Sequence, residues 1–74
     1  MRYVVNSWVA GERDQSWKAL GMRRARSIAE TVIREYRERG VEQFEVMISE
    51  NRRGVPIVDF YSSETGEWQG PLPS

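Results

Sequence analysis

One segment of the chain has a clear helical period, and it limits what the rest of the chain can fold into. Between Leu20 and Tyr36 the apolar residues recur at steps of three and four, which places them on one stripe of a helix. The stripe consists of Leu20, Ala25, Ile28, Ala29, Val32, Ile33 and Tyr36. We expect the main helix at 22–39, ended by Gly40, since glycine readily takes the left-handed conformation found after helices. One amphipathic helix cannot bury its own stripe, so a second layer must cover it.

The segments around this helix predict that the second layer is a sheet. β-Branched and aromatic residues fill 2–9, and clean alternation of apolar and polar residues marks 43–50. A turn at 51–54 leads to a further strand at 55–62, and a short last strand is expected at 67–69. Because tight turns join the last three strands, antiparallel pairing is favoured.

The predicted fold is therefore α+β, with one long helix packed on a three- to four-stranded, mostly antiparallel sheet in the order β-α-β-β-β. Residues 10–16 are expected to form a loop in which Asp14 or Ser16 caps a short first helical turn, 16–20, which Gly21 separates from the main helix. A chain of 74 residues makes one domain, here 1–69, and the segment 70–74 is expected to form a C-terminal tail.

Composition removes most catalytic chemistry. The chain has neither histidine nor cysteine, so the common nucleophile–base pairs and disulfides are excluded, and a zinc site would need carboxylates alone. Neither a phosphate-binding glycine loop nor a calcium loop is present. We expect no enzymatic activity, no catalytic residue, no cofactor and no metal site. The absence of cysteine and of targeting or membrane-spanning segments predicts a cytoplasmic protein that does not use a membrane.

The charged residues indicate a binding surface. Eleven cations balance eleven anions, and all the cations except Lys18 are arginine. Over 30–39, arginines and glutamates lie four apart, a pattern typical of a solvated helix face. Other arginines form two basic groups, of which the one at the helix start has no acidic residue close behind it before Glu30 and is unfavourable with the helix dipole. They are Arg23, Arg24 and Arg26 at the helix start and Arg52 and Arg53 in the turn. Whether the two groups meet in space stays open.

A second candidate surface is the sheet face turned away from the helix. Alternation predicts that five apolar side chains pack against the helix: Phe44, Val46, Ile48, Val58 and Phe60. Met47, Ile57 and Tyr61 then point outward, and Trp68 joins them across the hairpin. Such a mixture of Met, Tyr and Trp is typical of protein interfaces, and it could also close a homodimer. Alternatively, Tyr61 and Trp68 cover each other as a cross-strand pair.

The strand–helix–hairpin order, the small size and the absence of histidine and cysteine resemble those of many small phage or mobile-element proteins. Some of these, including anti-CRISPR inhibitors, act by occluding a larger assembly, so the resemblance implies an inhibitor of that kind. The double-stranded-RNA-binding domain also packs helices on an antiparallel meander, but this chain lacks a counterpart of that domain's C-terminal helix.

The sequence thus predicts a small, non-catalytic binding protein. The first expectation is a protein partner or complex, including one that handles nucleic acid, contacted through the five arginines or through Met47, Tyr61 and Trp68. One alternative is direct binding of nucleic acid by the same arginines. Another is a structural homodimer.

Overall fold

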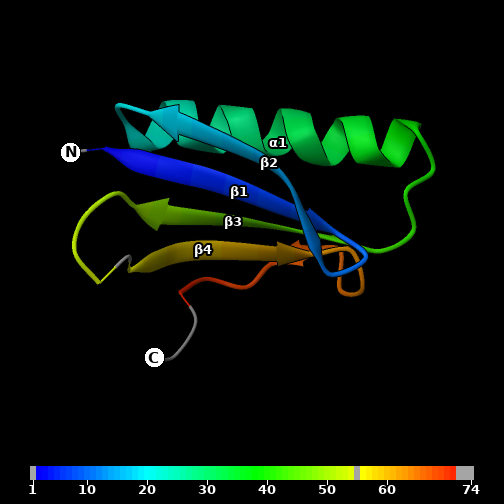
Figure 1. The fold of residues 1–74 in the computed structure, drawn as a ribbon. Helices are drawn as coiled ribbons and strands as arrows, with labels where there is room; N and C mark the ends of the chain where they lie inside the picture. The colour runs from blue at the N-terminus through cyan, green and yellow to red at the C-terminus, as the bar shows by residue number, and fades with distance from the viewer. Residues whose placement is uncertain (1, 55, 72–74) are drawn as a thin grey trace.

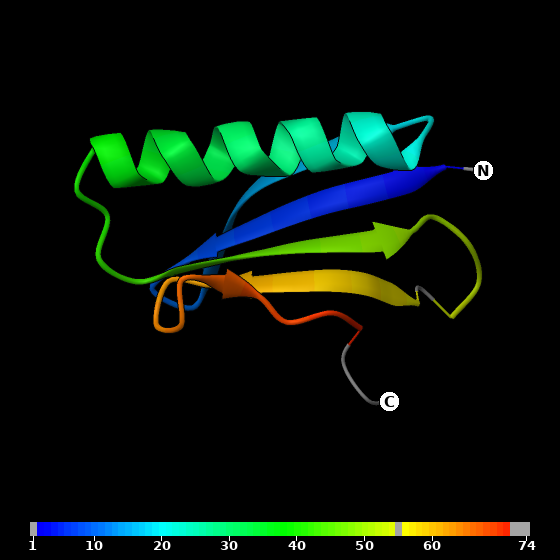
Figure 2. The same ribbon diagram turned by 180° about the vertical axis from the view of Figure 1, so that it is seen from behind.

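The protein, seen here as a computed structural model that describes residues 2–54 and 56–71, has two layers. Its elements are β1 (Tyr3–Val9), β2 (Glu12–Ala19), α1 (Met22–Glu38), β3 (Phe44–Glu50), β4 (Ile57–Ser62) and β5 (Glu67–Trp68). The strands form one antiparallel sheet in the order β2-β1-β3-β4-β5. β2 passes in front of α1 in Figure 1 and behind it in Figure 2, so α1 covers a single face of the sheet.

The predicted class is confirmed, because one helix packs on an antiparallel sheet. The predicted helix at 22–39 agrees with α1, and Gly40 has a φ of 73°, as expected for a residue after a helix end. The expected strand at 55–62 begins at Ile57, and Val55 lies outside the described residues. The last three residues of the expected tail, 72–74, also lie outside them.

The loop expected at 10–16 is wrong, and the sheet gains a strand there. Ala10 and Gly11 both have positive φ, 52° and 83°, which is typical of a two-residue hairpin turn whose twist matches the flanking strands. β2 then pairs with β1 along its length, so Asp14 and Ser16 lie in a strand and cap nothing. The residue that precedes α1 is Gly21, and no side chain caps the helix there.

The core lies between α1 and the face of the sheet that α1 covers. It joins the helix residues Ala25, Ala29, Val32, Ile33 and Tyr36 to Val5, Ala19, Phe44, Val46, Ile48 and Tyr61. Leu20, which the helical pattern placed in the stripe, lies before α1 and is 75% exposed. The stripe of α1 otherwise packs as predicted, with Ile28 partly buried at its edge.

The predicted facing of β4 is inverted at Phe60 and Tyr61, whereas Val58 packs against the core as predicted. Tyr61 pairs with buried Val46 and points toward α1, whereas Phe60 pairs with Met47 on the outer face. The facing changes at a register shift between Ile48 and Ser49, where Val58 is the extra residue of β4. Asp59 then faces α1 and finds partners there: Arg26 Nη1 donates to its Oδ2 at 2.7 Å, and the Gly70 N–H donates to its Oδ1 at 2.7 Å. A satisfied carboxylate can occupy a core position that hydrophobic alternation alone would reject.

Trp68 follows Tyr61 onto the helix side. Their ring centroids lie 5.6 Å apart in an edge-on arrangement, and the Arg26 guanidinium lies 4.5 Å from the centroid of the Trp68 ring. Arg37 also donates a hydrogen bond to the Tyr61 hydroxyl. Tyr61 and Trp68 therefore do cover each other, but they do so beside α1 and not on the outer face of the sheet.

Candidate functional site

The two groups of arginines predicted as a binding surface lie at the same end of the molecule. Tyr3 pairs with Ala19, the last residue of β2, and with Glu50, the last residue of β3. The Asn51 N–H donates to the Arg2 carbonyl at 2.9 Å. The N-terminal segment, the connection from β2 to α1 and the turn after β3 consequently meet at one end, on the left in Figure 1. We call this the basic end.

The basic end has a strong excess of positive charge. Its cations are all exposed, namely Arg2, Lys18, Arg23, Arg24, Arg52 and Arg53, and its carboxylate is Glu50. The opposite, acidic end carries Glu12, Asp14, Glu35, Glu38, Glu42, Glu45, Glu64 and Glu67 against Arg13, Arg37 and Arg39. The net charge of zero is therefore the sum of two ends of opposite sign: the basic end has an excess of five positive charges, and the acidic end has an excess of five negative charges.

Internal ion pairs remove some of the predicted arginines from this surface. Arg26 is held by Asp59 at 2.7 Å, and Arg52 Nε lies 2.6 Å from Glu50 Oε2. These are the ion pairs found in the part of the chain that the structure describes. Arg23, Arg24 and Arg53 are exposed and belong to neither pair, so they are the predicted arginines that stay open to a partner.

Two exposed hydrophobic side chains lie beside these cations, and the sequence pattern missed both. Leu20 is 75% exposed in the short connection between β2 and α1, in sequence between Lys18 and Arg23. Trp17 is 50% exposed near the end of β2. The sequence pattern predicts a short helical turn at 16–20 for both residues, separated by Gly21 from the main helix. The structure instead places Trp17 in β2 and Leu20 in the connection to α1.

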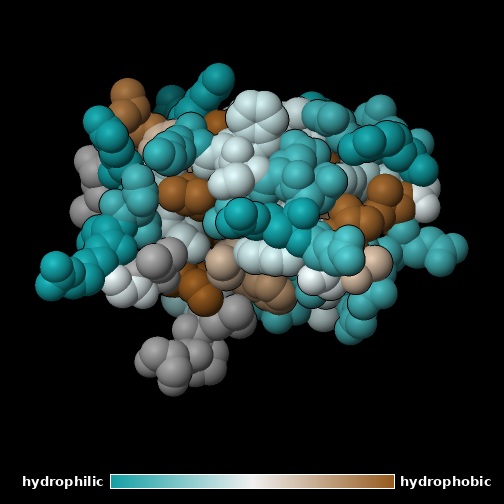
Figure 3. All heavy atoms as spheres, viewed as in Figure 1, coloured by the Kyte–Doolittle hydropathy of each residue, from teal (hydrophilic) through white to brown (hydrophobic). Residues whose placement is uncertain are grey.

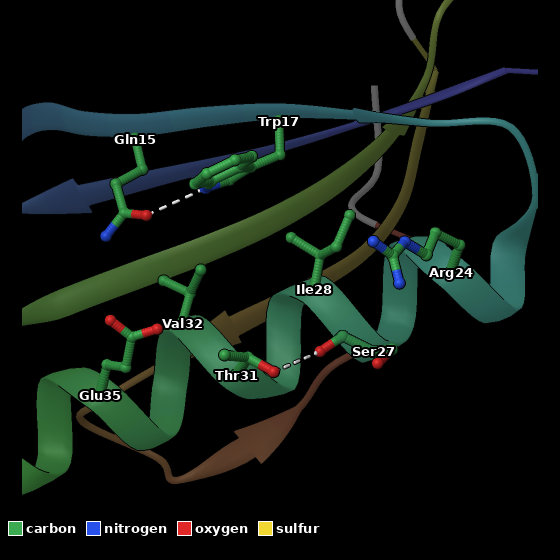
Figure 4. Close-up of a pocket in the computed structure, with 8 residues that line it drawn as sticks. All are labelled: Gln15, Trp17, Arg24, Ser27, Ile28, Thr31, Val32 and Glu35. Carbon is green, nitrogen blue, oxygen red and sulfur yellow. Dashed lines mark hydrogen bonds between the residues drawn. The ribbon is translucent and has the colours of Figure 1, made fainter.

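A groove runs between β2 and α1 (Figure 4). Its volume is about 290 Å³, and its lining comprises Gln15, Trp17, Arg24, Ser27, Ile28, Thr31, Val32 and Glu35. The Trp17 indole N–H donates to Gln15 Oε1 at 2.9 Å, which fixes the ring over the groove. Ile28 and Val32 point toward this ring from α1, and Arg24 and Glu35 lie at opposite ends of the groove. The groove is thus apolar in the middle and charged at its ends.

The outer face of the sheet presents fewer predicted residues than expected. Met47 does lie on it, beside Phe60 and Trp8 around a depression of about 300 Å³. Tyr61 and Trp68 do not, since both pack on the helix side. Figure 3, viewed from the same side as Figure 1, shows brown hydrophobic atoms in separate spots among teal hydrophilic ones. This face is therefore a weaker docking candidate than the basic end.

A buried polar network near the acidic end has a structural role. The Tyr36 hydroxyl donates to Asp14 Oδ2 at 2.5 Å and lies 2.7 Å from Ser7 Oγ, which accepts from the Gln15 N–H at 3.1 Å. Burial, together with the hydrogen bond to Asp14, raises the pKa of Tyr36 above its ordinary value of 10.0. The neutral hydroxyl joins α1 to β1 and β2 where their register shifts.

The described residues contain no group of three or more carboxylates that could hold a metal ion. In the part of the chain that the structure describes, α1 is also neither long nor apolar enough to cross a bilayer. A scan against protein-family models finds no match, and searches of the curated proteins and of the solved structures find none either.

Proposed function

We propose that this protein is a non-catalytic binding protein that docks by its basic end on an acidic surface of a protein partner, such as a component of a larger assembly. The observation that carries the proposal is Leu20, which is 75% exposed at an end that holds six cations and one carboxylate. An exposed apolar side chain at the same end as several exposed arginines matches the common anatomy of an interface, in which a buried anchor lies inside a polar rim.

Leu20 favours a protein partner over nucleic acid. A leucine gains free energy by entering an apolar pocket, roughly 1.5–3 kcal/mol for full burial. A phosphate backbone offers no such pocket. Arg26 and Arg52, two of the five arginines predicted to contact phosphate, are also engaged by Asp59 and Glu50. The remaining cations lie at the same end of the molecule as Leu20, which supports recognition of an acidic rim around an apolar pocket.

The test is capture of partners from an extract of the source cell, followed by a binding measurement between the two purified proteins. Leu20→Asp should weaken the measured affinity at least about tenfold, because it removes the anchor and adds a charge that the acidic partner repels. Arg23→Glu should weaken it as well and should make it less sensitive to salt. The control Arg37→Glu makes the same charge change at the acidic end and should leave the affinity unchanged.

Direct nucleic-acid binding is the alternative outcome. It predicts that the purified protein alone shifts a duplex or single-stranded oligonucleotide at physiological salt, with affinity that falls steeply as salt rises. Docking on a protein is the wrong function if Arg23→Glu abolishes that shift and Leu20→Ser leaves it unchanged. In that case Leu20→Asp would weaken the shift only through its added negative charge.

A further inference from the structure

We propose that two copies of this chain pair through their β2 strands, with a two-fold axis near Ser16 and both α1 helices on the same side of one continuous sheet. β2 is the outermost strand of the sheet, so one side of its backbone faces no other strand in the described residues. A free edge of this kind accepts another strand through main-chain hydrogen bonds. The lining of the groove beside the edge indicates that the incoming strand comes from a second copy.

The α1 side of the groove is complementary to itself. Arg24 lies at one end and Glu35 at the other, with Ile28 and Thr31 between them. A two-fold axis reverses this order in the second copy. It therefore sets Arg24 opposite the second copy's Glu35, and Ile28 opposite its Thr31. Each symmetric dimer then contains two Arg24–Glu35 pairs, and each pair neutralises a charge that finds no ion-pair partner among the described residues of the monomer.

The β2 side gives the same axis. Residues directly opposite each other in antiparallel strands point to the same face of the sheet. Both helices lie on one face only if each β2 residue is opposite a residue that points to that same face in its own copy. This condition holds when the two-fold axis passes through a residue of β2, and it fails when the axis passes between two residues. An axis at Ser16 pairs Gln15 with Trp17 of the second copy, and both residues line the groove. Since Gln15 and Trp17 flank Ser16, the axis also falls midway along the groove, between its two charged ends.

Pairing in this register would cover the most exposed aromatic ring in the described residues. Trp17 is 50% exposed in the monomer. Each α1 also covers β1 and β3, so it lies back from the β2 edge of its own copy. The axes of the two helices in the dimer would therefore lie further apart than the roughly 8–10 Å of directly packed helices. The two Trp17 rings and the long side chains of Arg24 and Glu35 line the sides that would face this space.

The charges of the whole molecule favour the same arrangement. Antiparallel pairing along β2 sets the basic end of one copy beside the acidic end of the other. Lys18 of one copy then lies near the stretch from Glu12 to Asp14 of the other. An unrelated strand would have to offer opposite charges at the correct ends of the groove, whereas a second copy supplies them by symmetry.

The test is sedimentation equilibrium of the purified protein over a range of concentrations. The wild type should rise from the monomer mass of 8.7 kDa toward twice that mass. Glu35→Arg should raise the dimer dissociation constant at least about tenfold, because two attractive pairs per dimer become repulsive. Arg24→Glu should do the same, and the double variant with both substitutions should recover most of the loss. Trp17→Ala should leave only monomer.

The matched control is Glu38→Arg, the same charge change one turn further along α1, at a residue that does not line the groove but lines a separate hollow with Trp68 and Tyr61. It should dimerise like the wild type, and circular dichroism should show that all variants are folded. A wild type that stays monomeric at millimolar concentration overturns the proposal. So does a dimer that resists both Glu35→Arg and Trp17→Ala, or a double variant no tighter than either single one. None of these results bears on docking by Leu20 and Arg23.

Discussion

Burial, and not distance, should decide what the two ion pairs contribute to stability. Arg26–Asp59 and Arg52–Glu50 have nearly equal separations, 2.7 Å and 2.6 Å. The Asp59 and Glu50 side chains are 10% and 21% exposed, and the side chains of their partners Arg26 and Arg52 are 35% and 63% exposed. The partners of a buried carboxylate cannot regain all of their hydrogen bonds from water when it is removed, whereas an exposed arginine can. Substitutions that remove each carboxylate should therefore have very different effects.

Asp59→Ala should cost about 3 kcal/mol of unfolding free energy. The carboxylate accepts from Arg26 at 2.7 Å, from the Gly70 N–H at 2.7 Å and from the Phe60 N–H at 2.9 Å, and a hydrogen bond to a charged group contributes roughly 1.5–3 kcal/mol. Arg26 is 35% exposed on its side chain and can turn toward water, which limits the loss. The total unfolding free energy of a domain of this size is about 4–11 kcal/mol, so this loss is a large share of it.

Urea and thermal denaturation followed by circular dichroism measure this loss. Each kcal/mol shifts the midpoint by about 4–8 °C in a domain of this size, so Asp59→Ala should melt about 12–24 °C lower. The control Glu50→Ala should cost no more than about 0.5 kcal/mol. Equal losses for the two variants would refute the reasoning, as would a loss below about 1 kcal/mol for Asp59→Ala. A double-mutant cycle with Arg26→Ala isolates the pair itself.

Three further predictions test other parts of the fold. The raised pKa of Tyr36 means that the folded state holds the hydroxyl proton more tightly, so its contribution is full below pH about 10 and is lost as pH rises through the raised value. Tyr36→Phe should lack this alkaline loss of unfolding free energy, measured by urea titration at pH values on both sides of 10. Ala10→Asn should add about 0.5–1 kcal/mol in the same assay, because asparagine tolerates the φ of 52° better than alanine. Trp68→Ala should lower the melting temperature without changing the dimer constant, since Trp68 packs against Tyr61 and Arg26 inside one copy.

The sequence predicted the elements that bury a regular pattern. The stripe of α1 and the alternation of Phe44, Val46 and Ile48 each have one face in the core, so hydrophobic spacing locates them. β2 has no such signal, because it is an edge strand and six of its eight side chains are exposed. Its position follows from the turn at Ala10 and Gly11. This turn is hard to predict from the sequence, because alanine is an uncommon residue at positive φ.

The candidate site was predictable only in part, because it depends on tertiary pairings. The unpaired character of Arg23 and Arg24 was visible from the lack of nearby acidic residues. Arg26 looked the same in sequence, but its partner Asp59 lies 33 residues away. Whether Arg53 meets the start of α1 depends on β1 pairing with both β2 and β3, which no local pattern indicates.

The two proposed interactions share Arg24, and this makes them competitive. In the dimer Arg24 faces Glu35 of the second copy, so it is less available to an acidic partner at the basic end. Because linkage is reciprocal, a partner that engages Arg24 should favour the monomer. Glu35→Arg, which prevents pairing but leaves the basic end intact, should therefore bind the docking partner at least as tightly as the wild type. Weaker binding by Glu35→Arg would instead place the β2–α1 groove within the docking surface itself, and the two interactions would then be one.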